Sequence, residues 1–265
     1  MNTEKTLISF LITHYNRPSD LLTCIDAIKN LDITNSQVVV SDDASTIENL
    51  KIIKKYPIDT LILSKTNNGL AANINKGLAA CDGQYIIYCQ EDFVLHSSIK
   101  NILTECIKVL ESGKADLIRF TANFKFKKLI NLTENIALIP KFSIANFMQN
   151  YYQYSDHPFI TKKSFYDSFG YYLENTSGRY GETEYAIRIC NSKAKIAITK
   201  NYIASNIIGS TSVLLNEMNV KQNNYKLNKS IIKFLRVIRL YFEWLFYNKQ
   251  KRGLITYKNG RNKTN

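Results

Sequence analysis

Short apolar runs recur along the first third of the chain and predict buried strands. They are rich in β-branched residues and lie at 6–13, 37–41, 60–64 and 85–90. Segments between them, such as 19–31 and 69–80, place apolar residues at helical spacing. Strands that alternate with helices form a parallel sheet whose two faces are both covered. The pattern therefore predicts an α/β fold with ligands at the carboxyl ends of the strands.

The pattern is less regular after residue 96. The elements expected there are a helix at 98–112, a strand at 116–120 and helices at 162–170 and 182–191. Residues 121–160 are aromatic and irregular, and their pattern predicts no element. We expect one domain over 1–227, in which residues 1–96 and 97–227 form two halves.

The last segment, 228–265, differs in composition from the rest. Between Lys229 and Tyr247 the charged residues fall on one stripe of a helix, and nearly all other positions are apolar. This stripe consists of Lys229, Lys233, Arg236, Arg239 and Glu243. Four cations disfavour a membrane span. Two interpretations remain open: an amphipathic helix on an anionic membrane surface, or a helix packed on its own domain or on a second copy.

Composition narrows the choice of class and compartment. The 265 residues are 45% hydrophobic, which is enough for a full core, and the formal net charge of +13 favours an anionic partner. The five cysteines form no CxxC pair, and the apolar run from Leu7 to Ile12 is too short for a signal peptide. We therefore expect a cytoplasmic protein, with a peripheral position on the inner face of the cell membrane as a second option.

Acidic residues follow two of the predicted strands. The strand QVVVS leads into Asp42 and Asp43, and YIIYC leads into Gln90, Glu91 and Asp92. Carboxylates at such an edge can bind ribose or base groups, and they suit the hard cations that accompany a nucleotide diphosphate. Taken singly, each acid is more typical of an Asx turn or a helix cap.

Order and spacing distinguish these motifs from isolated turns. VVVSDDAST, NNGLAANINKG and GQYIIYCQED follow one another over residues 6–95. In this order the chain resembles glycosyltransferase family 2, the inverting group that includes bacterial capsule, O-antigen and hyaluronan or chondroitin synthases. The resemblance implies a GT-A (Rossmann-like) fold with a mostly parallel central sheet, to which the basic C-terminal helix would be appended.

The same resemblance implies a donor site in 1–96 and an acceptor site in 97–227. It suggests a UDP-sugar donor, with Mg²⁺ or Mn²⁺ bound through Asp92. Donor contacts are expected from Thr13, Tyr15, Asp42, Asp43, Lys65, Asn68, Gly69, Gln90 and Glu91. Gln90 departs from the family, which usually has the first Asp of its D-x-D motif there.

The segment GETEYAIR resembles the family's E-D-x-D-L-x-x-R helix. It implies that Glu182 is the base that takes the proton from the acceptor hydroxyl. The alternative is a helix whose first turn favours acids, with an i,i+4 pair between Glu184 and Arg188. Glu184, Arg188 and His157 are candidate acceptor-side residues.

The predicted activity is transfer of a sugar to a glycan or lipid-linked acceptor in surface polysaccharide synthesis. Ser205–Ser212 resembles the family's H-x-G-x-x-S loop but lacks its histidine. A sugar-phosphate nucleotidyltransferase is a rival, although the glycine-rich phosphate loop of that class is absent between Thr13 and Pro18. A degenerate domain that only binds its ligand is another rival, whereas no nucleic-acid-binding motif is present.

Overall fold

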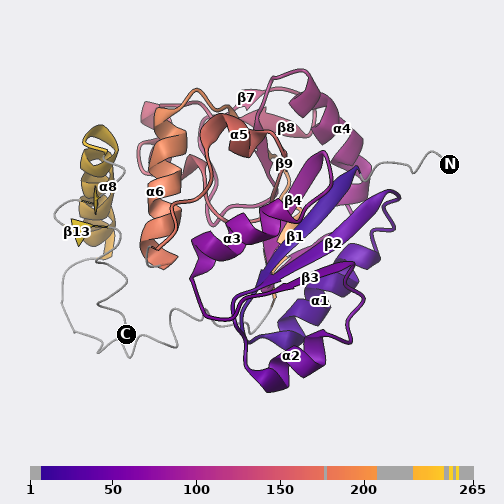
Figure 1. The fold of residues 1–265 in the computed structure, drawn as a ribbon. Coiled ribbons are helices and arrows are strands. Elements are labelled where there is room, and N and C mark those ends of the chain that lie inside the picture. Colours follow the sequence, from indigo (N-terminus) through magenta and orange to yellow (C-terminus); the bar gives the residue numbers. More distant parts are fainter. Residues whose placement is uncertain (1–6, 176–177, 208–228, 248–250, 253–254, 257–265) are drawn as a thin grey trace.

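The computed structural model describes residues 7–175, 178–207, 229–247, 251–252 and 255–256, and it forms a large sheet with helices on both faces (Figure 1). The sheet has nine strands in the order β3-β2-β1-β4-β9-β6-β10-β8-β7. These strands are β1 (Ile8–His14), β2 (Ser36–Asp42), β3 (Thr60–Leu63), β4 (Tyr85–Gln90), β6 (Leu117–Arg119), β7 (Ile130–Asn131), β8 (Ile136–Leu138), β9 (Phe159–Lys162) and β10 (Ile196–Thr199). A separate pair joins β5 (Phe93–Leu95) to β11 (Ala204–Asn206), and another joins β12 (Lys251–Arg252) to β13 (Ile255–Thr256).

The first four strands pair in parallel, as the sequence predicts. β1 is buried at every position, so it is apolar on both faces, as a central strand of a parallel sheet requires. The sheet then becomes mixed, because β9 runs antiparallel between β4 and β6. Residues from both predicted halves, 1–96 and 97–227, therefore contribute to one continuous sheet.

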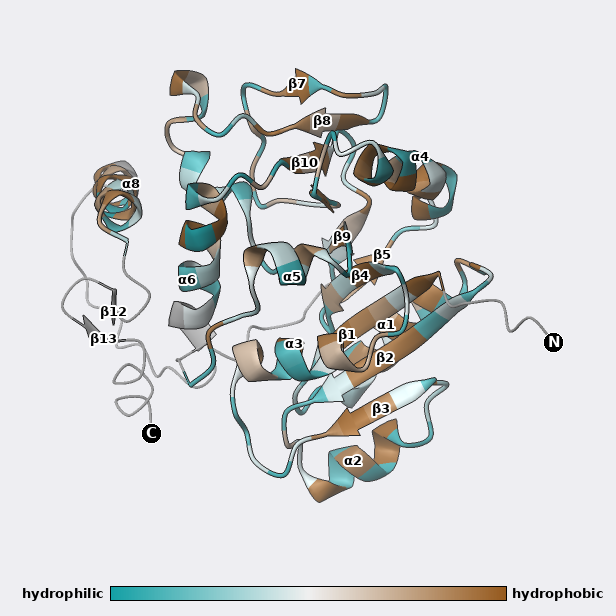
Figure 2. Ribbon diagram, turned by 45° about the horizontal axis from the view of Figure 1, so that its top comes forward, coloured by the Kyte–Doolittle hydropathy of each residue, from teal (hydrophilic) through white to brown (hydrophobic). Residues whose placement is uncertain are grey.

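Two helical layers bury the faces of the sheet. One contains α1 (Pro18–Lys29), α2 (Ile47–Ile53) and α4 (Ile99–Glu111), which pack on residues such as Phe10, Val38 and Ile87. The other contains α3 (Leu70–Ala79), α5 (Phe165–Phe169) and α6 (Gly178–Asn191). Figure 2 shows β1, β2 and β4 coloured as predominantly hydrophobic between these layers.

One predicted element is partly wrong. The sequence predicts a helix over 162–170, but Lys162 ends β9 and only Phe165–Phe169 is helical. The main-chain N–H of Lys163 donates to the carbonyl of Gln84, so the strand edge continues past Lys162. The unplaced segment 121–160 contains β7, β8 and two short 3-10 helices, η1 (Ile144–Asn146) and η2 (Asn150–Gln153).

A final helix, α8 (Lys229–Leu245), lies outside α6 (Figure 1). Val237 and Leu240 are buried, and Trp244 Nε1 donates to Asn191 Oδ1 at 2.8 Å. The self-packing interpretation would bury Phe234, Leu235, Ile238, Phe242 and Leu245; Ile238 is half-buried, and the other four are exposed. No helix in the described part of the chain is both long enough and apolar enough to cross a bilayer.

Candidate active site

Three strand ends bring the predicted donor residues to one edge of the sheet. In the parallel register Thr13 lies opposite Ser41 on β2 and opposite Gln90 on β4. The main-chain N–H of Asp43 donates to His14, and that of Glu91 donates to Thr13. The Thr13 hydroxyl is buried and lies 3.2 Å from the Tyr88 hydroxyl. The two acidic motifs are therefore neighbours across β1.

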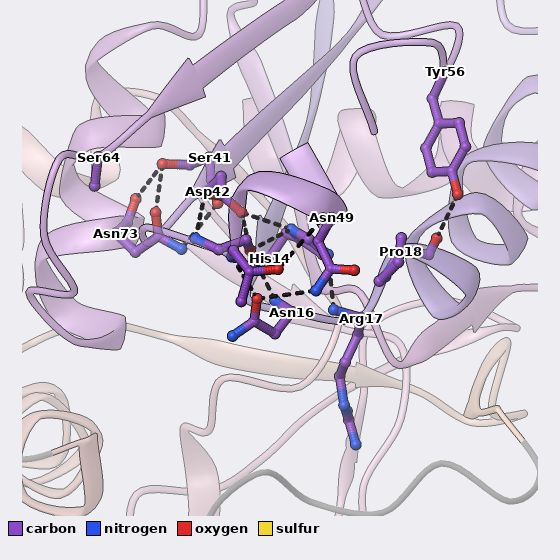
Figure 3. A network of polar contacts seen from close by, with 12 residues as sticks. His14, Asn16, Arg17, Pro18, Ser41, Asp42, Asn49, Tyr56, Ser64 and Asn73 are labelled. Atoms are coloured by element: carbon purple, nitrogen blue, oxygen red, sulfur yellow. Dashed lines mark hydrogen bonds and ion pairs between the residues drawn. The ribbon is translucent and has the colours of Figure 1, made fainter. Parts of the chain in front are cut away.

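Asp42 is fully buried in a network that joins β1 to β2 (Figure 3). Its Oδ2 accepts hydrogen bonds from His14 Nδ1 at 2.8 Å and from the Ser45 hydroxyl at 2.5 Å. His14 Nε2 accepts from the main-chain N–H of Arg17, which places the ring proton on Nδ1. Burial alone would raise the pKa of Asp42, but the hydrogen bonds from His14 and Ser45 lower it.

The loop after β1 is held by the same network. Asn16 has a positive φ of 55°, a conformation that asparagine tolerates well. Its Oδ1 accepts from the Thr46 main chain at 2.8 Å and from Asn49 Nδ2 at 3.1 Å, as Figure 3 shows for Asn49. Asp42 is hydrogen-bonded to His14 and Ser45, and the Ser45 hydroxyl accepts from the main-chain N–H of Asn16. Asp42 therefore helps to position this loop. Its expected contact with a donor stays a prediction.

Asp43 joins the second strand to the start of α3. Its Oδ1 accepts from the Asn68 main chain at 2.9 Å, and its Oδ2 accepts from the Gly69 main chain at 2.8 Å. Gly69 has a φ of 85°, which favours glycine at this turn. Burial raises the pKa of Asp43, although both main-chain hydrogen bonds and nearby Lys76 oppose the rise.

The surface around Asp43 is polar and basic. Lys65 and Asn68 are exposed, whereas Lys76 Nζ donates to the carbonyl of Asp42 at 2.9 Å. A cavity of about 460 Å³ adjoins Asn68. It is lined by Ser64, Asn68, Ala72, Asn75, Lys76, Glu174 and Asn175. Asn68 is thus the predicted donor residue that opens onto this cavity.

Two acids, Glu91 and Asp92, follow β4, and Asp92 faces Arg17. Arg17 Nη1 lies 3.5 Å from Asp92 Oδ2, and both side chains are mostly buried. Asp92 Oδ1 is buried and has no hydrogen-bond partner among the described residues. Burial raises the pKa of Asp92, and the charge of Arg17 opposes this rise.

Gln90 and Glu91 precede Asp92 and differ in their surroundings. Gln90 is partly exposed at the end of β4. Glu91 is buried, and this burial raises its pKa to about 8, against the opposing charge of Arg17 and a hydrogen bond from the main chain of Tyr15. Tyr15, which follows His14 at the end of β1, is partly exposed.

The predicted base lies at the same edge of the sheet. β4 and β9 pair antiparallel up to Tyr88 and Phe159, so Gln90–Asp92 and Asp156–His157 extend from that pair at the same edge. The main-chain N–H of Asp156 donates to Glu182 Oε1 at 3.3 Å. Burial raises the pKa of Glu182, while this hydrogen bond and the charge of Arg119 oppose the rise.

Asp156 was not expected from the sequence, and it forms a second buried acid beside Glu182. Its Oδ1 accepts from the hydroxyls of Tyr154 at 3.1 Å and Tyr172 at 2.9 Å. Its Oδ2 is buried without a partner among the described residues. Burial and the negative charge of Glu182 raise the pKa of Asp156 well above its usual value.

Arg119 is a second residue that the sequence did not indicate. It is buried at the end of β6, and its guanidinium donates to the carbonyls of Tyr152 and Gln153 and to the Ser155 hydroxyl. Burial lowers its pKa to about 10. It therefore holds the chain that leads into Asp156. The sequence feature that could have indicated Arg119 is a charged residue near the end of an apolar predicted strand.

His157 connects the two acidic regions. Its ring centroid lies 5.4 Å from that of Phe93, the residue after Asp92. Burial lowers the pKa of His157 to about 4, and the charge of Arg119 adds to this. His157 is therefore neutral near pH 7. Its contact with Phe93 joins the residue after Asp156 to the residue after Asp92.

Glu184 and Arg188 form the i,i+4 pair that the sequence allows. Arg188 donates from Nε at 3.0 Å and from Nη2 at 2.8 Å to the two oxygens of Glu184. Arg188 also donates to the carbonyls of Phe169 and Tyr171, so it ties α6 to the end of α5. This pair supports the helix that carries Glu182, and its acceptor-side role stays a prediction.

The described residues contain no group of three His, Cys, Asp or Glu side chains close enough to hold a metal ion. Asp92 nevertheless suits a role as a single carboxylate ligand, because its buried Oδ1 lacks a partner. Ile207 donates its main-chain N–H to the Asp92 carbonyl at 2.8 Å. The rest of Ser205–Ser212, from 208 onward, lies outside the described residues.

Comparison with solved structures supports the GT-A architecture. TarS from S. aureus, residues 1–349 in complex with UDP-GlcNAc, aligns with a TM-score of 0.60 at 15% identity, covering 93% of this chain and 68% of that one. The alignment with a longer TarS structure covers 41% of its length. Mannosyltransferase PcManGT from Pyrobaculum calidifontis, in complex with GDP-Man and Mn²⁺, aligns with a TM-score of 0.59 at 12% identity, covering 93% of this chain and 66% of that one.

Comparison of the sequence with curated proteins gives no significant match. The sequence profile described as glycosyl transferase family 2 matches residues 9–168, which is more than half of the chain. This match includes all three donor-side motifs and extends through β9 and α5. The chain belongs to glycosyl transferase family 2 and is a glycosyltransferase with the GT-A fold.

Proposed function

We propose that this glycosyltransferase moves a sugar from a nucleotide diphosphate donor to a hydroxyl of a glycan or lipid-linked acceptor, with inversion at the anomeric carbon. The observation that carries the proposal is the convergence of two acidic regions. Asp92 follows β4, and Glu182 accepts a hydrogen bond from Asp156, which lies shortly before β9, the strand that pairs with β4. This arrangement suits a donor on one side and an acceptor on the other.

A UDP-sugar is the donor that we favour. TarS has been solved with UDP-GlcNAc and with UDP, whereas PcManGT has been solved with GDP-Man. At the strand ends, exposed Lys65 and Asn68 and partly exposed Tyr15 and Gln90 offer cationic, amide and aromatic groups to a nucleotide. Asp43 would act with the turn before α3, because it already accepts from the main-chain N–H groups of Asn68 and Gly69 there.

Asp92 is the residue that would hold Mg²⁺ or Mn²⁺, through its unpartnered Oδ1. When bound, the cation neutralises charge on the departing diphosphate. Arg17, 3.5 Å from the other oxygen of Asp92, opposes the rise in the pKa of Asp92 that burial causes, and it adds positive charge at this edge. PcManGT provides the parallel of a neighbour solved with Mn²⁺.

Glu182 is the proposed base for the acceptor. The acceptor oxygen forms the new bond to the anomeric carbon, its proton passes to a Glu182 oxygen, and the bonding pair of the old C–O bond leaves with the nucleoside diphosphate. A pKa raised by burial makes Glu182 a stronger proton acceptor than an exposed glutamate. Asp156 positions Glu182 through its main-chain N–H.

The test is release of nucleotide from a panel of UDP- and GDP-sugars, with Mn²⁺, with Mg²⁺ and with EDTA. We expect release that requires the cation, and Asp92→Asn should reduce it to background. Asp82→Asn, which changes an exposed aspartate outside the site, is the matched control. Equal donor affinity with and without EDTA would exclude the metal role. Donor binding without any turnover would instead favour a degenerate binding domain.

A further inference from the structure

The helix α8 presents two different apolar faces. One packs against α6 and η2 through Val237 and Leu240, which are 4% and 3% exposed. Tyr241 strengthens this contact, since its hydroxyl donates to the Phe147 carbonyl at 2.7 Å. Trp244 adds its bond to Asn191. Among the described residues, the helix therefore packs on the domain through this one side.

The opposite face is unusually apolar for a surface. It consists of Ile231, Leu235, Phe242, Leu245 and Phe246, which are all between 49% and 74% exposed. At 100° per residue these positions fall on the side away from Val237 and Leu240. Figures 1 and 2 show α8 at the periphery, with α6 between it and the sheet. A continuous patch of large exposed apolar side chains marks an interaction surface.

Cations lie beside this apolar face. Arg236 and Arg239 are exposed, and at 100° per residue Arg239 borders the face. Arg239 lies 3.3 Å from Glu243 on its own helix. The charge is also concentrated in sequence: residues 229–265 carry ten of the 35 Lys and Arg residues but one of the 22 Asp and Glu residues. An apolar face beside a strongly cationic segment is complementary to an anionic lipid surface.

We propose that the outer face of α8 docks the enzyme onto an anionic membrane. Leu235, Phe242 and Leu245 would enter the boundary between head groups and acyl chains, and Arg236 and Arg239 would face lipid phosphates. A second copy is the less suitable occupant, because pairing through this face would bring two cationic segments together. The inference does not depend on the donor or the acceptor that the enzyme uses.

The test uses the full chain with vesicles of phosphatidylcholine alone and of phosphatidylcholine with phosphatidylglycerol. We expect co-sedimentation with the anionic vesicles that weakens as salt rises. Leu235→Glu/Phe242→Glu should weaken it by about tenfold or more, because two large apolar side chains no longer transfer into the membrane. Both positions are exposed, so this variant should keep the melting temperature of the wild type.

The matched control is Ile47→Glu/Ile130→Glu, which changes two exposed isoleucines elsewhere by the same charge. It should bind as the wild type does, and turnover on a soluble acceptor should be the same in all three proteins. Equal loss in both variants would show that net charge alone binds the vesicles, and would overturn the proposal. So would absent vesicle binding together with a dimer that Leu235→Glu/Phe242→Glu dissociates, which would assign the face to a second copy.

Discussion

Asp42 and Asp43 on the donor side are held differently from Asp156 on the acceptor side. On the donor side, both oxygens of Asp42 and both oxygens of Asp43 accept hydrogen bonds from nearby groups. On the acceptor side, Asp156 Oδ2, Arg119 Nε and His157 Nδ1 are buried without partners among the described residues. The hydrogen bonds of Asp42 and Asp43 order loops. The buried polar atoms without partners instead carry a desolvation cost that no hydrogen bond offsets.

This difference separates the residues that build the site from those that are poised for chemistry. The pKa of Asp42 is lowered, so its ionised form is favoured in the fold. The pKa values of Glu182 and Asp156 are raised by burial, so the fold opposes their ionised forms. Groups perturbed in this direction are common where proton transfer takes place. Substitution of Asp42 should therefore affect mainly stability, and substitution of Glu182 mainly turnover.

The largest expected effect tests the acceptor side. Glu182→Gln keeps the size of the side chain and its acceptor for the Asp156 N–H, but removes the basic oxygen. We expect turnover to fall by about 10²-fold or more, the usual scale of general base assistance. Donor affinity, measured by titration calorimetry, should be nearly unchanged.

The control for this variant is Glu184→Gln, which changes the neighbouring buried acid of the same helix. Glu184 is paired with Arg188, so its loss should lower the melting temperature more than the turnover of the folded enzyme. Normal turnover in Glu182→Gln, with loss of turnover in a stable Glu184→Gln protein, would transfer the role of the base to Glu184.

The next effect tests the donor side. In Asp42→Asn the amide nitrogen cannot accept from His14 or Ser45, so a buried donor loses its partner. We expect the free energy of unfolding, measured in urea, to fall by about 1–3 kcal/mol. Asp26→Asn, at an exposed position of α1, should have little effect. A stable Asp42→Asn protein with impaired donor binding would remove the distinction between the two sides.

The two sides also differ in how far the sequence predicts them. The partners of Asp42 and Asp43 are set by strand ends whose apolar runs are visible in the sequence, and those strands have nearly the predicted bounds. Glu182 could be found because its helix follows a recognisable pattern. The family match covers 9–168 and ends before Glu182, so the assignment of its role rests on the motif and the geometry.

Asp156 and the partners of Arg119 could not be predicted, because side chains rather than periodic main-chain bonds shape residues 121–160. Asn146 exchanges two hydrogen bonds with the main chain of Lys128, and Asn150 does the same with Ser143. Such contacts leave no hydrophobic period. β9 was also misjudged, because an antiparallel strand inserted beside β4 depends on tertiary pairing and not on local pattern.

The smallest effect gives the sharpest test of the comparison. Asp156→Asn keeps an oxygen that can accept from Tyr154 and Tyr172, and it replaces the unpartnered Oδ2 with an amide nitrogen. The folded pKa of Asp156 is raised, so between the ordinary pKa and the folded one the folded protein binds more protons than the unfolded chain. Stability of the wild type is therefore lost as pH rises through that window.

Because asparagine does not titrate in this range, the variant escapes this loss. We expect the melting temperature of Asp156→Asn to exceed that of the wild type at pH 8. The difference should be smaller than the fall in melting temperature that Asp42→Asn causes. The melting temperatures of Asp156→Asn and the wild type should converge toward pH 4, near the ordinary pKa of an aspartate. Asp32→Asn, at an exposed position, should show no such pH-dependent difference. A lower melting temperature for Asp156→Asn at every pH would mean that Asp156 stabilises the fold as Asp42 does. The acceptor side would then be held as the donor side is, and its raised pKa values would no longer mark it as the reactive half.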